Sequence, residues 1–258
     1  MAHFDDAAVQ YDNDFSHAAI GSRLRSHVWN MMAQYIPTGC KDVLEINCGT
    51  GEDALYLADK GYKVTATDAS PVMIQVANTK TRSGNPLFRV VEFNDIDKKF
   101  AQQSFDFVFS NFGGLNCASH QELKGILEGI HKLLRPGGVF VAVIMGSRCM
   151  WEQAYYLLKR DTKRAFRRYK KYGSETIIGS RHFKTYYYSP ADVKRMACPM
   201  FTFVKQHPIG FFIPPTFTEH YFKKHINQLD ALVKLENSVK NTSILANMAD
   251  HFMIVLKN

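Results

Sequence analysis

The chain has 258 residues, of which 46% are apolar, 13% aromatic and 22% charged. This composition can bury a sizeable core, so it excludes disordered, collagenous and coiled-coil proteins, and the length suits one large domain. The formal charge of +8 raises the question of an anionic partner, which depends on where the charge lies.

The first half of the chain alternates between two patterns. An amphipathic segment at 18–35 is followed by short runs rich in β-branched and aromatic residues, separated by segments of helical period. This alternation is typical of βαβ units and a parallel sheet. We expect strands at 42–46, 63–67, 87–92, 105–110 and 139–144, and helices at about 52–60, from 71 and at about 119–134. Gly61, Ser70-Pro71 and Pro136-Gly137-Gly138 provide the stop, start and turn signals between them.

The alternation breaks after residue 144 for about forty residues. This interruption predicts a helix and a hairpin pairing 176–178 with 183–188, and we then expect a helix from 190, strands at 201–205 and 251–256, and a helix at 219–239. The simplest organisation is a single domain over 1–258. Its parts are an N-terminal helical segment at 1–38, a core at 39–147, an insertion at about 148–188 and a C-terminal part at 189–258 that completes the sheet.

The positive charge is concentrated in one segment. Residues 159–171 contain eight Lys or Arg and one acid, Asp161, so they carry nearly all of the excess. Apolar residues in and just before this segment follow a helical stripe: Tyr155, Leu158, Phe166 and Tyr169. We therefore expect a basic helix there. It is either a solvated face or a surface for an acidic substrate, anionic lipid or nucleic acid.

Several classes of protein are disfavoured. The longest apolar run, 139–145, is far shorter than the 18 or so residues of a membrane span, and the acidic N-terminus is unlike a secretory signal, so we expect a cytoplasmic protein. The ten histidines show no ligand-like pairing, so we expect no metal site. The five cysteines contain no Cys-x-x-Cys pair, and we expect mostly buried, reduced thiols at Cys40, Cys48, Cys117, Cys149 and Cys198.

A glycine-containing loop follows the first predicted strand. It reads Glu45-Ile46-Asn47-Cys48-Gly49-Thr50-Gly51 and runs into a helix, at the sheet edge where open α/β folds bind ligands. A dinucleotide fold requires Gly-x-Gly-x-x-Gly, whereas here Asn47 and Glu52 stand at the outer positions. A carboxylate at Glu52 would repel a pyrophosphate, and Glu45 suits a cationic ligand.

This loop resembles the first motif of the class I S-adenosylmethionine-dependent methyltransferases, acid-x-Gly-x-Gly-x-Gly. Further similar motifs follow in the family's order, through Phe105–Asn111 and the turn Leu133–Gly138. The resemblance implies a Rossmann-like seven-stranded sheet, mostly parallel with the last strand antiparallel, helices on both faces and, in this chain, a helix-hairpin insertion after strand five. It also implies S-adenosylmethionine as cofactor and S-adenosylhomocysteine as its product.

The resemblance assigns site residues by position. Asp68 matches the acid that binds both ribose hydroxyls, and Asp95 and Ile96 match the adenine site. The same site would include Cys48, Gly49, Gly51, Ala69, Met73, Ser110 and Asn111. Asn47 departs from the family glycine, but asparagine tolerates left-handed backbone. Tyr11 is similar to a tyrosine that closes over the cofactor, and Arg25 is a candidate for its carboxylate.

Methyl transfer from a sulfonium mainly requires alignment of the acceptor and exclusion of water. No motif identifies a general base, and Asn111 and His182 are weak candidates by position. Aromatic residues in the later segments predict an apolar acceptor pocket: Phe183, Tyr186, Tyr187, Tyr188, Phe211, Phe212, Phe217, Tyr221 and Phe222.

Three functions remain open at this point. The first is a methyltransferase for a small, partly hydrophobic acceptor, and the second is an RNA or protein methyltransferase that uses the basic segment. The third is a module that binds the cofactor without turnover. The sequence after the fourth strand, Ser110–Gly114, lacks the Asn/Asp-Pro-Pro-aromatic motif of nucleic-acid adenine methylation, which disfavours nucleic acid.

Overall fold

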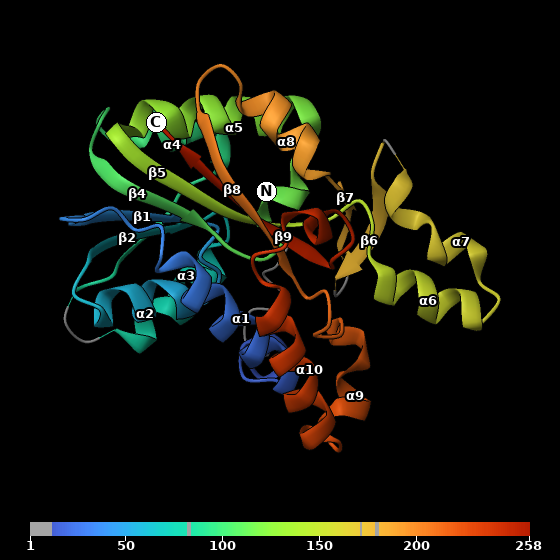
Figure 1. Cartoon of the computed structure of the whole chain (residues 1–258). Coiled ribbons are helices and arrows are strands. Elements are labelled where there is room, and N and C mark those ends of the chain that lie inside the picture. Colours follow the sequence, from blue (N-terminus) through green and yellow to red (C-terminus); the bar gives the residue numbers. More distant parts are fainter. Residues whose placement is uncertain (1–11, 82–83, 171, 179–180) are drawn as a thin grey trace.

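A seven-stranded sheet forms the centre of the computed structural model, which describes residues 12–81, 84–170, 172–178 and 181–258 (Figure 1). Its strand order is β3 (Leu87–Val90), β2 (Lys63–Asp68), β1 (Asp42–Ile46), β4 (Phe105–Ser110), β5 (Leu134–Met145), β9 (His251–Lys257) and β8 (Thr202–Ile209). Strand β9 is antiparallel to both of its neighbours, whereas β3, β2, β1, β4 and β5 pair in parallel. The predicted fold class is confirmed.

Helices cover both faces of this sheet (Figure 1). One face packs against α1 (Ala19–Met32), α2 (Glu52–Asp59), α3 (Pro71–Lys80) and α10 (Ile226–Val239), and the other against α4 (Ile96–Lys99), α5 (His120–Leu133) and α8 (Pro190–Ala197). The central strands are therefore buried on both sides, which explains why they read as continuous apolar runs rather than alternating ones. In β4, Phe107 and Phe109 enter one core and Val108 the other.

Local capping signals set the helix boundaries close to those predicted. The hydroxyl of Ser70 accepts the Met73 N–H at the start of α3, with Pro71 in the first turn. Ser119 and Glu122 form a reciprocal capping box that starts α5. Each cap satisfies N–H groups that the first helical turn leaves without a partner.

The basic helix predicted over 159–171 is not formed as one element. Helix α6 (Met150–Leu158) ends before Arg160, which adopts left-handed backbone with φ 58°. Asp161 then accepts the Arg164 N–H and starts the short α7 (Thr162–Ala165), followed by a 3-10 turn at Arg167–Tyr169. A single left-handed residue is enough to end a helix, so the prediction of one continuous helix was wrong.

The predicted helix at 219–239 is also interrupted. It divides into α9 (Glu219–Phe222) and α10, because His225 between them has non-helical backbone with φ −128° and ψ 51°. The Glu219 carboxylate, at the start of α9, caps a different helix. Its oxygens accept the N–H groups of Ala19 and Ile20 at the start of α1, at 2.7 and 2.9 Å. This long-range cap could not be read from the local pattern.

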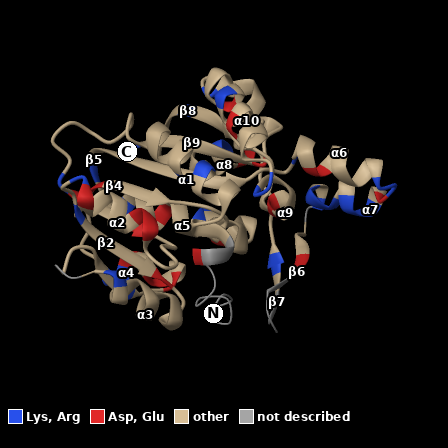
Figure 2. Ribbon diagram, turned by 90° about the horizontal axis from the view of Figure 1, so that it is seen from below, with Lys and Arg blue, Asp and Glu red and all other residues tan. Residues whose placement is uncertain are grey.

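The insertion after β5 contains α6, α7 and the predicted hairpin, formed by β6 (Ser174–Ile178) and β7 (Arg181–Thr185). It projects from the end of the sheet in Figure 1, and Figure 2 shows Lys and Arg along α7. Across the described ranges, no helix is long and apolar enough to cross a membrane.

A buried ion-pair network attaches the insertion to the sheet. Arg168 is 7% exposed and donates to Glu152 Oε2 at 2.7 and 2.9 Å and to Asp250 Oδ1 at 2.6 Å. It also donates to the carbonyl oxygens of Gly146 and Asp250, while Arg167 donates to the other oxygen of Glu152 at 2.5 Å. Two of the eight basic residues in 159–171 are thus committed to structure.

Replacing Arg168 by Met should lower the free energy of unfolding by about 3–5 kcal/mol, because Glu152 and Asp250 would remain buried without their cation. The exposed Lys163 supplies the control, and K163M should change this free energy by about 0.5 kcal/mol or less. Urea denaturation measures both values. Equal losses in the two variants would show that the network does not anchor the insertion.

Candidate functional site

The loop between β1 and α2 adopts the left-handed turns that its sequence predicts. Asn47 has φ 53°, Gly49 φ 53° and Gly51 φ 86°. A Cβ at Gly51 would lie 2.6 Å from the ring of Phe88, so this glycine is required by packing as well as by its backbone. The loop therefore lies close against the sheet edge, with its backbone accessible from one side.

Asn47, which replaces the first family glycine, joins two loops at this edge. Its Nδ2 donates to the Asn111 carbonyl oxygen at 2.7 Å, and its Oδ1 accepts from Ser110 Oγ at 2.6 Å. A Cβ at Gly114 would lie 2.4 Å from the Asn47 side chain, which explains the glycine there. The departure from the family motif is thus accommodated by contacts to the end of β4.

Asp68 fixes the geometry at the end of β2. Its Oδ2 accepts the Gly49 N–H and its Oδ1 accepts the Ser70 N–H, both at 2.9 Å. One carboxylate therefore holds the loop after β1 and the start of α3 at the same place.

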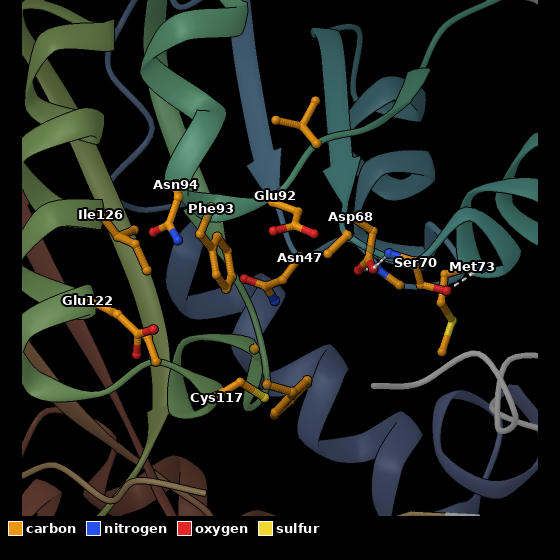
Figure 3. Close-up of a pocket in the computed structure, with 16 residues that line it drawn as sticks. Asn47, Asp68, Ser70, Met73, Glu92, Phe93, Asn94, Cys117, Glu122 and Ile126 are labelled. Carbon is orange, nitrogen blue, oxygen red and sulfur yellow. Dashed lines mark hydrogen bonds between the residues drawn. The ribbon is translucent and has the colours of Figure 1, made fainter. Parts of the chain in front are cut away.

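A cavity of about 220 Å³ opens beside these loops (Figure 3). Its walls come from the ends of β1, β2, β3 and β4 and from α5; the residues are Asn47, Gly49, Asp68, Ala69, Ser70, Met73, Val91, Glu92, Phe93, Asn94, Phe112, Gly114, Cys117, Ala118, Glu122 and Ile126. They include three carboxylates, of Asp68, Glu92 and Glu122, and no Lys, Arg or His. Such a lining favours a cationic ligand and disfavours a phosphate.

The residues after β3 enter the cavity in a register different from the predicted one. Asp95 points to solvent, where its carboxylate pairs with Lys98 at 2.9 Å, and Ile96 is buried in the core. Phe93 and Asn94 line the cavity instead (Figure 3). The chain makes a 3-10 turn at Phe93–Asp95, and this turn directs consecutive side chains to different sides. The predicted cavity positions of Asp95 and Ile96 were wrong.

Glu45 also differs from its expected place at the ligand. Its side chain is buried beneath the loop, lines neither described cavity, and has no hydrogen bond to its carboxyl oxygens within the described part of the chain. Burial raises its pKa well above the ordinary range, and the charge of Asp53 adds to this effect. Burial therefore favours the neutral form of its carboxyl group over the ionised form.

A smaller cavity, of about 30 Å³, lies next to the first and is lined in part by Arg25, Cys48 and Asn111. Arg25 is buried and forms an ion pair with Asp53 at 2.5 Å, and Asn111 donates to the same carboxylate at 3.1 Å. Arg25 thus lines the small cavity, as expected of a residue that binds a ligand carboxylate, but its charge is already neutralised by the carboxylate of Asp53.

The remaining predicted residues are distributed as follows. Ala69 and Met73 line the large cavity, whereas Ser110 is buried behind it. His182 lies in β7, but the structure does not describe its side chain. Tyr11 lies outside the residues that the structure describes.

The predicted aromatic wall is not formed at either described cavity. None of the nine aromatic residues proposed for it lines them, and Tyr188, for example, is fully buried. Phe112 takes this place instead, with strained backbone at φ 35°. Its ring makes edge contacts with Phe15 at 5.2 Å and His251 at 5.5 Å between centroids.

His251 was missed by sequence reasoning. It begins β9 opposite Met145, at the same edge of the sheet as the cavity, and its Nδ1 lies 3.2 Å from Asp250 Oδ2. Burial would raise the pKa of Asp250, but His251 and Arg168 hold it below its ordinary value, so Asp250 is charged. The only sign of this site in the sequence was an Asp followed by a His where a strand begins.

Comparison with known proteins agrees with this geometry. Residues 43–138 match the model of the methyltransferase domain family. An uncharacterized methyltransferase of Synechocystis sp. is 30% identical over 132 residues, which cover 51% of this chain and 59% of the relative. Glycine N-methyltransferase of Oryctolagus cuniculus is 34% identical over 118 residues, 40% of each chain. The chain thus spans about half the length of the curated relatives it matches.

A solved structure shares the whole architecture. The S-adenosylmethionine-dependent methyltransferase of Methanosarcina mazei aligns with a TM-score of 0.61 and 19% identity, covering 88% of this chain and 96% of the other. At this identity the likeness establishes the fold alone. Residues 43–138 are thus similar to the methyltransferase domain family, and the chain shares the fold of an S-adenosylmethionine-dependent methyltransferase.

Replacing Glu45 by Gln should stabilise the protein, increasingly so as pH rises above about 4.5. The Glu45 carboxyl group binds its proton more tightly in the folded state than in the unfolded state. Its contribution to stability is therefore complete below the unfolded pKa and is lost as pH rises toward the folded pKa, by up to about 1.4 kcal/mol per pH unit. Denaturation at pH 5, 6, 7 and 8 measures this slope. A stability difference that does not grow with pH would show that the pKa of Glu45 is not raised in the folded protein.

Proposed function

We propose that this protein transfers a methyl group from S-adenosylmethionine to a small, partly hydrophobic acceptor. The observation that carries the proposal is the charge of the large cavity, where three carboxylates face a space that no basic side chain of the described residues lines. S-adenosylmethionine supplies a methyl group already activated on positively charged sulfur. A cavity with negative walls suits this cation and opposes the pyrophosphate of a dinucleotide.

The donor set fits the parts of this ligand. Asp68 lines the cavity with a carboxylate, a group that can accept several hydrogen bonds, so it can bind the ribose hydroxyls. Asn94 offers a carbonyl oxygen to an exocyclic amine, between the apolar side chains of Phe93 and Ile126. The amide of Asn94 therefore takes over the role first predicted for Asp95.

The chain's own residues would align the acceptor and exclude water. Phe112 lines the cavity, and its ring contacts that of His251 at 5.5 Å between centroids. The charged Asp250 favours the proton on Nδ1 of His251, so Nε2 keeps the lone pair that could take a proton from a hydroxyl acceptor. His251 joins Asn111 and His182 as a candidate base.

Two observations favour a small acceptor over RNA. The basic segment is divided at Arg160, and Arg167 and Arg168 are engaged with Glu152 rather than available to phosphates. Phe112 and Ala118 add apolar surface to the wall of the cavity. These features suit a compact acceptor with an apolar part.

Titration calorimetry with S-adenosylhomocysteine tests the binding site. The wild type should bind the ligand, and D68N should bind it about 10- to 100-fold more weakly, because a charged acceptor for the ribose is lost. D95N is the matched control and should bind as the wild type does, since Asp95 faces solvent. Unchanged affinity in D68N, or equal losses in both variants, would contradict the assignment.

A screen with labelled S-adenosylmethionine against extracted metabolites should yield a methylated small molecule. With that acceptor, H251Q should lower kcat by about 10²- to 10⁴-fold at neutral pH while the affinity for S-adenosylhomocysteine is retained. An unchanged kcat in H251Q would exclude His251 as the base, and transfer to RNA alone would overturn the small acceptor.

A further inference from the structure

The outer face of the insertion carries an apolar patch that the methyltransferase site does not use. Met150, Gln153 and Leu157 follow one another along one face of α6 at helical spacing. Gln153 donates to the hydroxyl of Tyr169 at 3.1 Å, and the Tyr169 ring lies 5.9 Å from that of Phe166. Together with Leu158 at the end of α6, the residues Met150, Leu157, Phe166 and Tyr169 form what we call the insertion patch.

The insertion patch is unusually exposed for side chains of this kind. Met150, Leu157, Phe166 and Tyr169 are 44 to 50% exposed, and Leu158 is 87% exposed. Tyr172 follows the patch and is 80% exposed. Single exposed apolar residues need no explanation, but a contiguous group on one projecting segment marks a surface that binds something.

The rim of the insertion patch is basic. The guanidinium of Arg148 lies over the Tyr169 ring, 5.9 Å from its centroid, and Lys163 and Lys170 are exposed beside Phe166 and Tyr169. Residues 148–170 contain only two acids. Glu152 is buried in the arginine network, and Asp161 pairs with Arg164 at 3.3 Å, so neither neutralises the rim.

The combination of aliphatic, aromatic and basic side chains discriminates between possible occupants. RNA would use the cations and could stack on the rings, but it has no use for the aliphatic Met150, Leu157 and Leu158. A second copy of this chain would bring one basic rim against another. An anionic bilayer satisfies every part of the surface, since the apolar side chains enter the acyl boundary, tyrosine lies at the headgroups and the cations meet anionic lipid.

We propose that the insertion patch docks the protein reversibly on the surface of a bilayer that contains anionic lipids. The residue after the hairpin of the insertion contacts the wall of the large cavity. Tyr186, just after β7, donates its N–H to the Asn116 carbonyl oxygen at 2.7 Å, and Asn116 lies in the 3-10 turn Gly114–Cys117, whose ends line the cavity. Docking would bring a membrane-dissolved acceptor near the site, but the docking proposal stands without methyl transfer.

Co-sedimentation of the full chain with vesicles tests the proposal directly. The wild type should bind vesicles of phosphatidylglycerol and phosphatidylcholine, bind pure phosphatidylcholine at least about tenfold more weakly, and lose affinity as salt is added. The double variants L157S/L158S and K163E/K170E should each lose at least about tenfold in affinity for the anionic vesicles. I244S changes another exposed apolar residue, 71% accessible and outside the insertion, and should bind as the wild type does.

Thermal melting and S-adenosylhomocysteine affinity, both unchanged in the variants, would confirm that they remain folded. Three results would overturn the proposal. The first is no binding of the wild type to anionic vesicles. The second is binding of L157S/L158S to vesicles as strongly as the wild type, which would show that charge alone drives the interaction. The third is a dimer in analytical ultracentrifugation that L157S/L158S dissociates, with no vesicle binding, which would assign the patch to a second copy.

Discussion

The Asp68 carboxylate is the contact on which the site depends. It ends β2 and accepts one backbone N–H from the loop after β1 and one from the start of α3, so it sets the position of both walls of the large cavity. Parallel strands place these loops at one edge of the sheet, and the carboxylate fixes their separation there. Because a carboxylate can accept several hydrogen bonds, the same group that organises the edge can also bind a ligand.

Much of the fold was predictable because its signals are local. The central strands are short apolar runs, and caps such as Ser70 and Ser119 mark helix starts whether or not the rest of the chain is known. Asn47 was correctly expected to accept left-handed backbone. The division of the basic segment at Arg160 was not predictable, since Arg has no intrinsic preference for that conformation.

The site was predictable only in part, for two physical reasons. In a 3-10 turn successive side chains point about 120° apart, so an error of one position changes which side chain enters the cavity. This explains why Asn94 rather than Asp95 lines it. The second reason is distance along the chain. Arg168 meets Asp250 across 82 residues, and Asp250 in turn holds His251, so a basic residue that reads as surface charge is part of a buried network. The periodicity of apolar residues does not reveal a contact between residues so far apart in the chain.

The insertion has two sides with different roles. Its inner side is fixed to the sheet by Arg167 and Arg168, while its outer side presents the insertion patch and the remaining cations. The charge that dominates the composition is therefore divided between structure and surface.

The most direct test of the central claim is a crystal structure of the protein with S-adenosylhomocysteine. The account predicts the ribose hydroxyls on the Asp68 carboxylate and the adenine between Phe93 and Ile126, with its amine at Asn94. A ligand held with its ribose away from Asp68, or bound outside the large cavity, would contradict it.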